Sequence, residues 1–357
     1  MTTDIETRPV LLLGSVPLQS AGDVFEQAGS RLGSLLGAVP DGETGERLAF
    51  ILWLMDRWRT KPGLAVVEEM TFHDPTTGGP RTVPFFGLAP GSGADQVDWS
   101  PMGYADFALR SYAEFTEARA AGALPSGVRF QVALPTPAGF ALLFPHDRDA
   151  VLPGIEREMA SEVAKVLAGI PDHDLTIQWD APGEVMAIER IRQEGAHPGA
   201  AAELLELATA SLARMIAPIP DSVAVGVHLC YGDPDGHHVI EPNDSSLMVD
   251  FTTRLIELVE RRVDYVHMPV PIERDDNAYF APLDDLELPP ETMLYLGLVH
   301  LEDGVEGAGR RAQTAIKHVP RFGIAAECGL GRERPGDVSA LLELHREVAE
   351  AEFAARA

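Results

Sequence analysis

From residue 170 onward, short apolar segments alternate with segments that carry apolar residues at helical spacing, and this rhythm constrains the fold more than any other feature of the chain. The apolar runs are uninterrupted, as in strands whose two faces are both covered. Repeated strand–helix units predict a parallel sheet. We therefore predict strands at 175–180, 223–230, 263–269, 293–300 and 322–329.

The first half of the chain has the same elements with less regular spacing. Apolar runs predict strands at 10–15 and 129–135, and helical spacing predicts helices near 20–37, 103–121 and 144–170. Residues 60–100 are rich in Pro, Gly and Thr, which predicts an irregular insertion with short strands. We expect a flexible N-terminus over residues 1–8 and a single domain over 9–357.

Polar or reactive residues end nearly every predicted strand. They are Ser15, Asp180, His228, His267, His300 and Glu327. A closed eight-stranded barrel gathers the carboxyl ends of all its strands around one mouth, whereas an open sheet spreads them along an edge. No GxGxxG motif follows a strand. We therefore predict an α/β fold, a (β/α)8 TIM barrel with an irregular insertion around residues 60–100.

Charge and composition exclude several classes of function. The chain has 55 acidic and 28 basic residues and a formal net charge of -27, which opposes binding to nucleic acid or to anionic membranes. No apolar run reaches the ~18 residues of a membrane helix, and the N-terminus lacks the pattern of a secretory signal. Two cysteines make no disulfide scaffold. We expect a cytoplasmic monomer or homodimer with both thiols free.

The only two cysteines stand at the ends of predicted strands. His228 and Cys230 are two residues apart in one strand, so their side chains point the same way. Cys328 ends the last strand, and in a barrel it could meet this pair across the mouth. Two sulfurs and one imidazole suit Zn²⁺, and three protein ligands with an open fourth position typify a catalytic site. An HxC pair also arises by chance, and a free cysteine is commonly a small buried hydrophobic residue.

Several short motifs together resemble one known family. They occur in the order GSVP (14–17), DGETGER (41–47), IQWDAP (177–182), HLCYGD (228–233) and AECGLGR (326–332). This series resembles the catalytic barrel of cobalamin-independent methionine synthase, within the uroporphyrinogen decarboxylase and methionine synthase-like superfamily. The resemblance implies a single-barrel enzyme that binds zinc through His228, Cys230 and Cys328.

The chain departs from the family at the fourth zinc ligand. The family has a glutamate where this chain has Pro269, which offers no ligating side chain. His267 lies two residues earlier on the same strand face and could substitute, or it could be a hydrogen-bonded strand histidine. Glu273 or Glu302 could reach in from a loop, and water or substrate could also fill the position.

The resemblance also implies a substrate site. Ser15, Glu43 and Asp180 match groups that hold the amino-acid part of the family's thiol substrate; Ser15 and Glu43 would also fit ordinary glycine-rich turns. We add Glu327 and Tyr279 as candidate substrate-binding residues.

The loop at 267–283 is expected to lie over the mouth of the barrel, where it would contact the substrate and determine specificity. Alternatively, its Arg and Asp residues pair with one another in solvent. We assign its Arg274 and Asp276, with Asp180 and His267, as candidate catalytic residues. His237 and His238 are expected to face solvent, and Arg332 to bind an anion or pair with Glu333.

These observations predict a zinc-dependent methyl- or alkyltransferase that activates a small, homocysteine-like thiol as a metal-bound thiolate. Its partners are the small-molecule thiol and a methyl or alkyl donor. The methionine synthase has a second barrel with no counterpart in this chain, so the donor need not be a folate. Two alternatives remain open: a metal-independent decarboxylase or lyase that uses Arg274, Asp276 and Asp180, and a non-catalytic protein that binds zinc or a small ligand.

Overall fold

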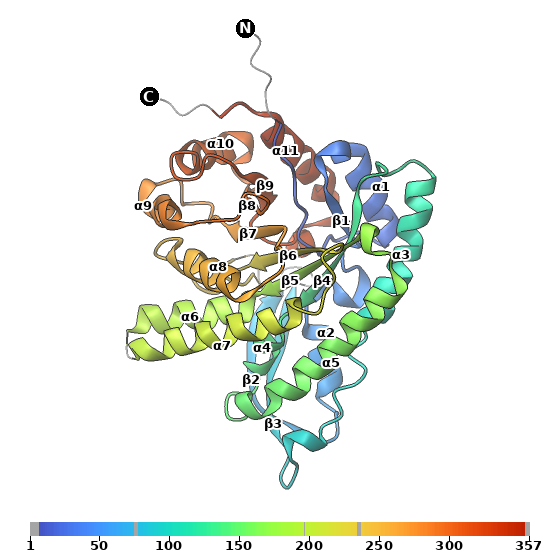
Figure 1. Cartoon of the computed structure of the whole chain (residues 1–357), viewed down its shortest axis with the longest axis vertical. Helices are drawn as coiled ribbons and strands as arrows, with labels where there is room; N and C mark the ends of the chain where they lie inside the picture. Colours follow the sequence, from blue (N-terminus) through green and yellow to red (C-terminus); the bar gives the residue numbers. More distant parts are fainter. Residues whose placement is uncertain (1–6, 75–77, 196, 234–236, 354–357) are drawn as a thin grey trace.

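The computed structural model describes residues 7–74, 78–195, 197–233 and 237–353, and the predicted alternation of strands and helices in the second half is confirmed (Figure 1). The strands are β1 (Ala38–Pro40), β2 (Leu64–Asp74), β3 (Gly79–Leu88), β4 (Arg129–Pro135), β5 (Leu175–Ala181), β6 (Ala224–Leu229), β7 (Tyr265–Pro269), β8 (Met293–Val299) and β9 (Gly323–Ala326). The helices are α1 (Ala21–Leu32), α2 (Leu52–Trp58), α3 (Tyr104–Ala120), α4 (Pro137–Ala141), α5 (Arg148–Gly169), α6 (Pro182–Glu194), α7 (Pro198–Ile216), α8 (Ser246–Leu258), α9 (Asn277–Phe280), α10 (Gly304–Ala315) and α11 (Val338–Glu350).

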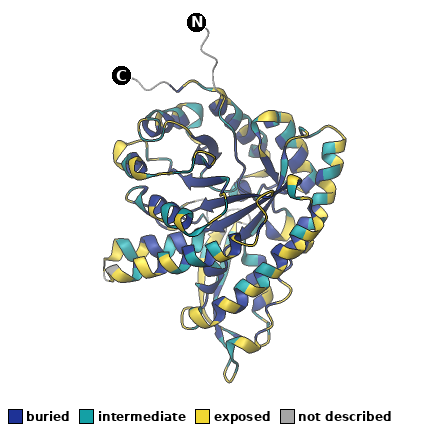
Figure 2. Cartoon of the chain, viewed as in Figure 1, coloured by how far each residue is buried: buried dark blue, intermediate teal, exposed yellow. Residues whose placement is uncertain are grey.

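Seven strands form one curled parallel sheet at the centre of the molecule, in the order β1-β4-β5-β6-β7-β8-β9. Every residue of β5 and β6 is buried, and Figure 2 shows the central strands in the colour of buried residues. Because both faces are covered, the strands are the continuous apolar runs seen in the sequence. The predicted α/β class with a parallel sheet is confirmed.

The segment before α1 contacts both edges of this sheet. Val10 forms single bridges to Leu36, just before β1, and to Ile324 in β9. No strand is assigned to residues 10–15, so the strand predicted there is not confirmed, and the described residues give seven strands in this sheet rather than the eight of the predicted barrel.

Side chains replace part of the missing backbone ladder. The Gln131 amide donates to the carbonyl of Leu12 (2.9 Å), and the Gln178 amide donates to the carbonyl of Leu13 (2.8 Å). These carbonyls therefore accept from buried glutamines rather than from the N–H groups of a neighbouring strand, which is a physical reason for the interrupted pairing.

The insertion is more regular than predicted. β2 and β3, of 11 and 10 residues, pair as an antiparallel hairpin (Figure 1) instead of the irregular segment with short strands. β-branched and aromatic residues favour this extended pairing. The buried ring of Phe86 anchors the base of the hairpin against Trp58 and Phe144, with ring centroids 6.0 and 5.6 Å away.

Of the predicted flexible N-terminus, residues 1–6 lie outside the described part of the chain. The backbone N–H of Arg8 donates to the carbonyl of Ala349 (3.1 Å), and its guanidinium lies over the rings of Phe322 and Phe353. In the ranges that the structure describes, no helix has both the length and the apolar character needed to cross a membrane.

Candidate metal and thiol-binding site

The strand register places the reactive side chains at one edge of the sheet. Asp180 of β5 pairs with His228 of β6, and His228 pairs with His267 of β7. Because parallel strands end at the same edge, all three side chains lie at the carboxyl end of the sheet, where barrel enzymes bind their substrates.

The three predicted metal ligands are brought together. Cys230 Sγ lies 3.6 Å from Cys328 Sγ, and Cys328 Sγ lies 3.9 Å from His228 Nε2. All three ligand atoms lie within 4.8 Å of one another, and this is the one such group of His, Cys, Asp or Glu side chains found in the described ranges. Two sulfurs and an imidazole nitrogen at this spacing fit a zinc site with an open fourth position.

The surroundings of Cys230 favour its thiolate. The hydrogen bond from the Cys328 thiol lowers the pKa of Cys230 well below its ordinary value, against the effect of burial. The backbone N–H of Gly232 also donates to Cys230 Sγ (3.3 Å). Because metal ligands must be deprotonated, this arrangement prepares one sulfur for a cation.

His267 does not offer a free nitrogen. Its Nδ1 lies 2.8 Å from Nδ1 of His228, and its Nε2 lies 3.0 Å from the carbonyl oxygen of Ala326. Burial, together with the neighbouring His228, lowers the pKa of His267 well below its ordinary value. His267 thus takes a hydrogen-bonding position instead of the open ligand position. The other candidates, Glu273 and Glu302, are exposed.

Ser15 joins the loop that follows Cys328 to the loop that carries Glu43. Its Oγ accepts from the N–H of Gly331 (3.2 Å), and Ser15 forms a bridge with Gly42. Glu43 adopts a left-handed backbone conformation (φ 47), which is rare for this residue and is typical of functional sites.

Glu43 is held by a buried ion pair. Its backbone N–H donates to Asp41 Oδ1 (2.9 Å), and Arg47 pairs with the other oxygen of Asp41 (2.6 Å). Burial raises the pKa of Glu43 to about 7, although Arg47 opposes this. Burial and the nearby Glu43 raise the pKa of Asp180 well above its ordinary value. Within the described part, neither Glu43 nor Asp180 has an ion-pair partner, and Asp180 Oδ1 accepts from the Gln178 amide (2.8 Å).

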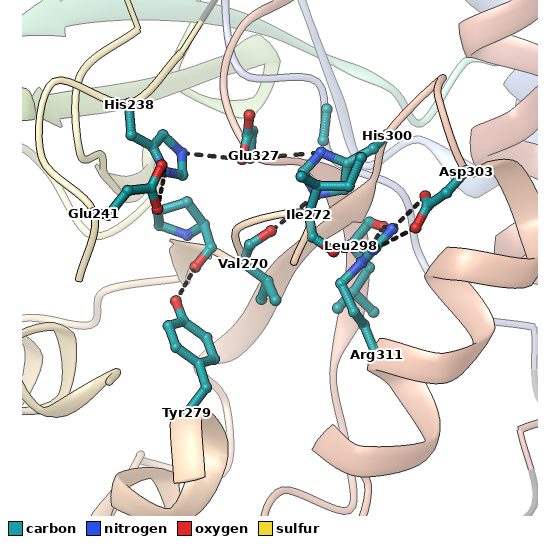
Figure 3. A network of polar contacts seen from close by, with 12 residues as sticks. His238, Glu241, Val270, Ile272, Tyr279, Leu298, His300, Asp303, Arg311 and Glu327 are labelled. Atoms are coloured by element: carbon teal, nitrogen blue, oxygen red, sulfur yellow. Dashed lines mark hydrogen bonds and ion pairs between the residues drawn. The ribbon is translucent and has the colours of Figure 1, made fainter. Parts of the chain in front are cut away.

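Glu327 is part of a second polar cluster beside Cys328 (Figure 3). Its carboxylate lies 3.0 Å from His238 Nε2 and 3.9 Å from His300 Nδ1. The prediction that His238 faces solvent is wrong, because only 5% of its side chain is exposed. Although burial lowers it, the hydrogen bond to Glu327 raises the pKa of His238 to about 9.

The loop after β7 is largely paired with itself and with its neighbours. Arg274 pairs with Asp276 (2.7 Å) and donates to the carbonyls of Pro242 and Asn243. Asp276 also caps α9 by accepting from the N–H of Tyr279 (3.1 Å).

Tyr279 is buried, and its hydroxyl donates to the carbonyl of Pro269 (2.7 Å; Figure 3). Of the three candidate residues in this loop, Arg274 borders a cavity of about 690 Å³ that extends to Glu327 and Cys328. Arg274, Asp276 and Tyr279 make none of their hydrogen bonds to the cysteines or to Asp180. Arg332 donates to the carbonyls of Asp233 and Leu48 and is not paired with Glu333.

A fully buried arginine connects α10 to the carboxyl end of β8 and to the loop after β7 (Figure 3). Arg311 of α10 pairs with Asp303 (2.7 Å) and donates to the carbonyls of Leu298 in β8 and Ile272 in the loop after β7. Sequence reasoning missed this residue and the Asp41–Arg47 pair and expected His238 in solvent, because an isolated charged residue carries no periodic signal that indicates a buried partner.

Comparisons with known proteins support the resemblance at the level of the fold. No protein-family model matches the chain, and no curated protein matches it. The chain is similar to the structure of a B12-independent methionine synthase from Shewanella sp. W3-18-1 in complex with selenomethionine, with a TM-score of 0.61, 14% identity, and coverage of 96% of this chain and 97% of that one.

Two further solved structures are similar. One is a putative vitamin-B12 independent methionine synthase from Listeria monocytogenes, with a TM-score of 0.54, 13% identity, and coverage of 92% of this chain and 86% of that one. The other is a methyltransferase from Methanosarcina mazei, with a TM-score of 0.50, 11% identity, and coverage of 96% and 94%. The predicted resemblance to the methionine synthase barrel is thereby confirmed for the fold.

Proposed function

We propose that this protein is a zinc-dependent methyl- or alkyltransferase that acts on a small thiol amino acid. The single observation that carries the proposal is the convergence of Cys230 Sγ, Cys328 Sγ and His228 Nε2 within 4.8 Å. Two soft thiolates and an imidazole nitrogen suit zinc, and the fourth position would be left for the substrate sulfur. When bound, zinc would stabilise the thiolate form of the substrate near neutral pH.

The neighbouring residues suit the amino-acid part of such a substrate. Glu43 and Asp180 are buried carboxyl groups that form no ion pair with the residues the structure describes, so they would suit an ammonium group. Ser15 accepts from the N–H of Gly331, so its own hydroxyl hydrogen is left to donate to a carboxylate. The Shewanella structure is a complex with selenomethionine; we infer an amino acid with a methylated chalcogen as the product class here.

The donor would approach from the cavity beside Cys328. Its lining has six carboxyl groups, of which Asp233 has its pKa raised to about 8 by burial, against two guanidinium groups and the imidazole of His238. His238 is already paired with Glu327, and Arg274 with Asp276. This lining favours a neutral or cationic methyl donor, such as a sulfonium, over a polyanionic one, because like charges repel in a partly enclosed site.

We further infer that residues 10–13 complete the sheet as an eighth strand, giving a (β/α)8 barrel. The bridges from Val10 to Leu36 and Ile324 support this closure. Closure would bring Ser15 to the same mouth as Asp180 and Cys328, as the substrate site requires.

The test combines metal analysis with turnover. We expect about one zinc per chain in the purified full-length protein, and transfer of a methyl group to homocysteine from a sulfonium donor. Cys230→Ser and Cys328→Ser are expected to lose both zinc and transfer. His173→Gln serves as the control and is expected to keep both zinc and transfer. His173 is exposed and lies in the turn directly before β5, at the opposite end of that strand from Asp180. A metal-free wild-type chain that ignores added zinc, or transfer that survives in Cys328→Ser, would refute the proposal.

A further inference from the structure

A chain of hydrogen bonds connects β6 and β9, whose carboxyl ends carry the proposed ligands, through His267 of β7. His228 of β6 faces His267 of β7, with Nδ1 of one ring 2.8 Å from Nδ1 of the other. The other nitrogen of His267, Nε2, lies 3.0 Å from the carbonyl oxygen of Ala326, two residues before Cys328. Both imidazoles are buried, so water does not replace these partners.

The positions of the protons follow from this chain. A carbonyl oxygen only accepts, so Nε2 of His267 must carry a hydrogen that it donates to Ala326. Only one hydrogen fits between the two Nδ1 atoms. In a neutral His267 that hydrogen belongs to His228, because the single ring hydrogen of His267 is already on Nε2. A neutral His228 with its hydrogen on Nδ1 has a lone pair on Nε2, the atom that lies 3.9 Å from Cys328 Sγ.

We propose that His267 is a positioning residue that fixes His228 in the tautomer able to bind a metal. The inference rests on the proposed zinc site, and it deepens that site by assigning the residue that orients its imidazole ligand. Histidine ligands commonly donate their second N–H to a fixed acceptor, and removal of such an acceptor costs about 10- to 100-fold in metal affinity. In this chain, the acceptor is a second imidazole, itself anchored to the backbone of β9.

The close approach of β8 to β9 supports the anchoring. A Cβ on Gly297 of β8 would lie 2.9 Å from the Ala326 carbonyl oxygen and 2.6 Å from the Cα of Glu327. Only glycine allows this approach without displacing the backbone. The Ala326 carbonyl is therefore held in place by packing, and His267 transmits that position to His228.

The test measures zinc affinity and the tautomer of His228 separately. In His267→Phe the ring volume is kept and both hydrogen bonds are lost, so we expect a 10- to 100-fold weaker Zn²⁺ affinity in competition with a chromophoric chelator. His267→Asn places an amide oxygen near the former Nδ1 and is expected to recover most of the affinity. His345→Phe is the matched control, because His345 is equally buried but lies in α11 with its Nδ1 on the Leu341 carbonyl.

The second readout does not depend on zinc. In metal-free protein labelled with ¹⁵N-histidine, and with His228→Gln used for assignment, we expect His228 to carry its hydrogen on Nδ1 in the wild type and to lose this preference in His267→Phe. Unchanged zinc affinity in His267→Phe, or a wild-type His228 with its hydrogen on Nε2, would overturn the inference. These two measurements test the role of His267 and do not test methyl transfer. If the tautomer is as expected but no methyl transfer is found, the proposed function is refuted and the inference about His267 stands.

Discussion

Glu184 gives a prediction whose size can be worked out from the structure. This residue lies in the first turn of α6, four positions after Asp180, and its side chain is fully buried. Its Oε1 accepts from the hydroxyl of Thr136, and its Oε2 has no hydrogen-bond partner among the described residues. Burial, opposed by the hydrogen bond from Thr136, raises the pKa of Glu184 from the ordinary value of 4.5 to about 7.

The sign of the effect follows from linkage. A carboxyl whose pKa is higher in the folded state binds its proton more tightly there, so the free energy of unfolding falls as pH rises from 4.5 through about 7. Each unit of difference corresponds to about 1.4 kcal/mol, so ionisation of Glu184 destabilises the folded state by up to about 3 kcal/mol above pH 7. Glu184→Gln removes this pH-dependent destabilisation, because an amide does not ionise.

The assay is urea unfolding of the wild type and Glu184→Gln between pH 5 and 8.5. We expect similar stabilities at pH 5 and a variant more stable than the wild type at pH 8, by up to about 3 kcal/mol. Glu287→Gln, a change at an exposed carboxyl, controls for the loss of one surface charge and is expected to show no such trend. A stability difference between Glu184→Gln and wild type that does not change with pH would refute the reasoning.

Three further predictions concern the site. Because the pKa of Glu43 is about 7, KM for the amino-acid thiol should fall as pH rises through 7, and Glu43→Gln should flatten this part of a KM–pH profile. Arg47→Met leaves Asp41 buried without its partner, so unfolding should show a loss of about 3–5 kcal/mol, with a raised KM in any folded fraction. In metal-free protein, hydrogen peroxide should oxidise Cys230 and Cys328 to a disulfide and be reduced to water. A thiol titration should then show the loss of two thiols per chain, and bound zinc should slow this loss.

The sequence was most informative where function depends on local spacing. The period of two in a strand places His228 and Cys230 on one face, and the order of the strands places their ends at one edge. These two rules, with the last strand predicted to end near Cys328, made the three residues a candidate metal site, and the family resemblance implied that they are its ligands. Glu43 and Ser15 came from the family resemblance. The structure connects Ser15 to the loop after Cys328, and Gly42, the neighbour of Glu43, forms a bridge with Ser15.

Tertiary contacts decided the features that spacing does not encode. Whether His267 would bind a metal or orient a ligand depends on the Ala326 carbonyl, which is 59 residues away in sequence and is placed by the approach of β9 to Gly297. The burial of His238 depends likewise on Glu327. A residue's type and period fix the direction of its side chain, but its partner is set by the curvature of the sheet and by the loops that close over its edge.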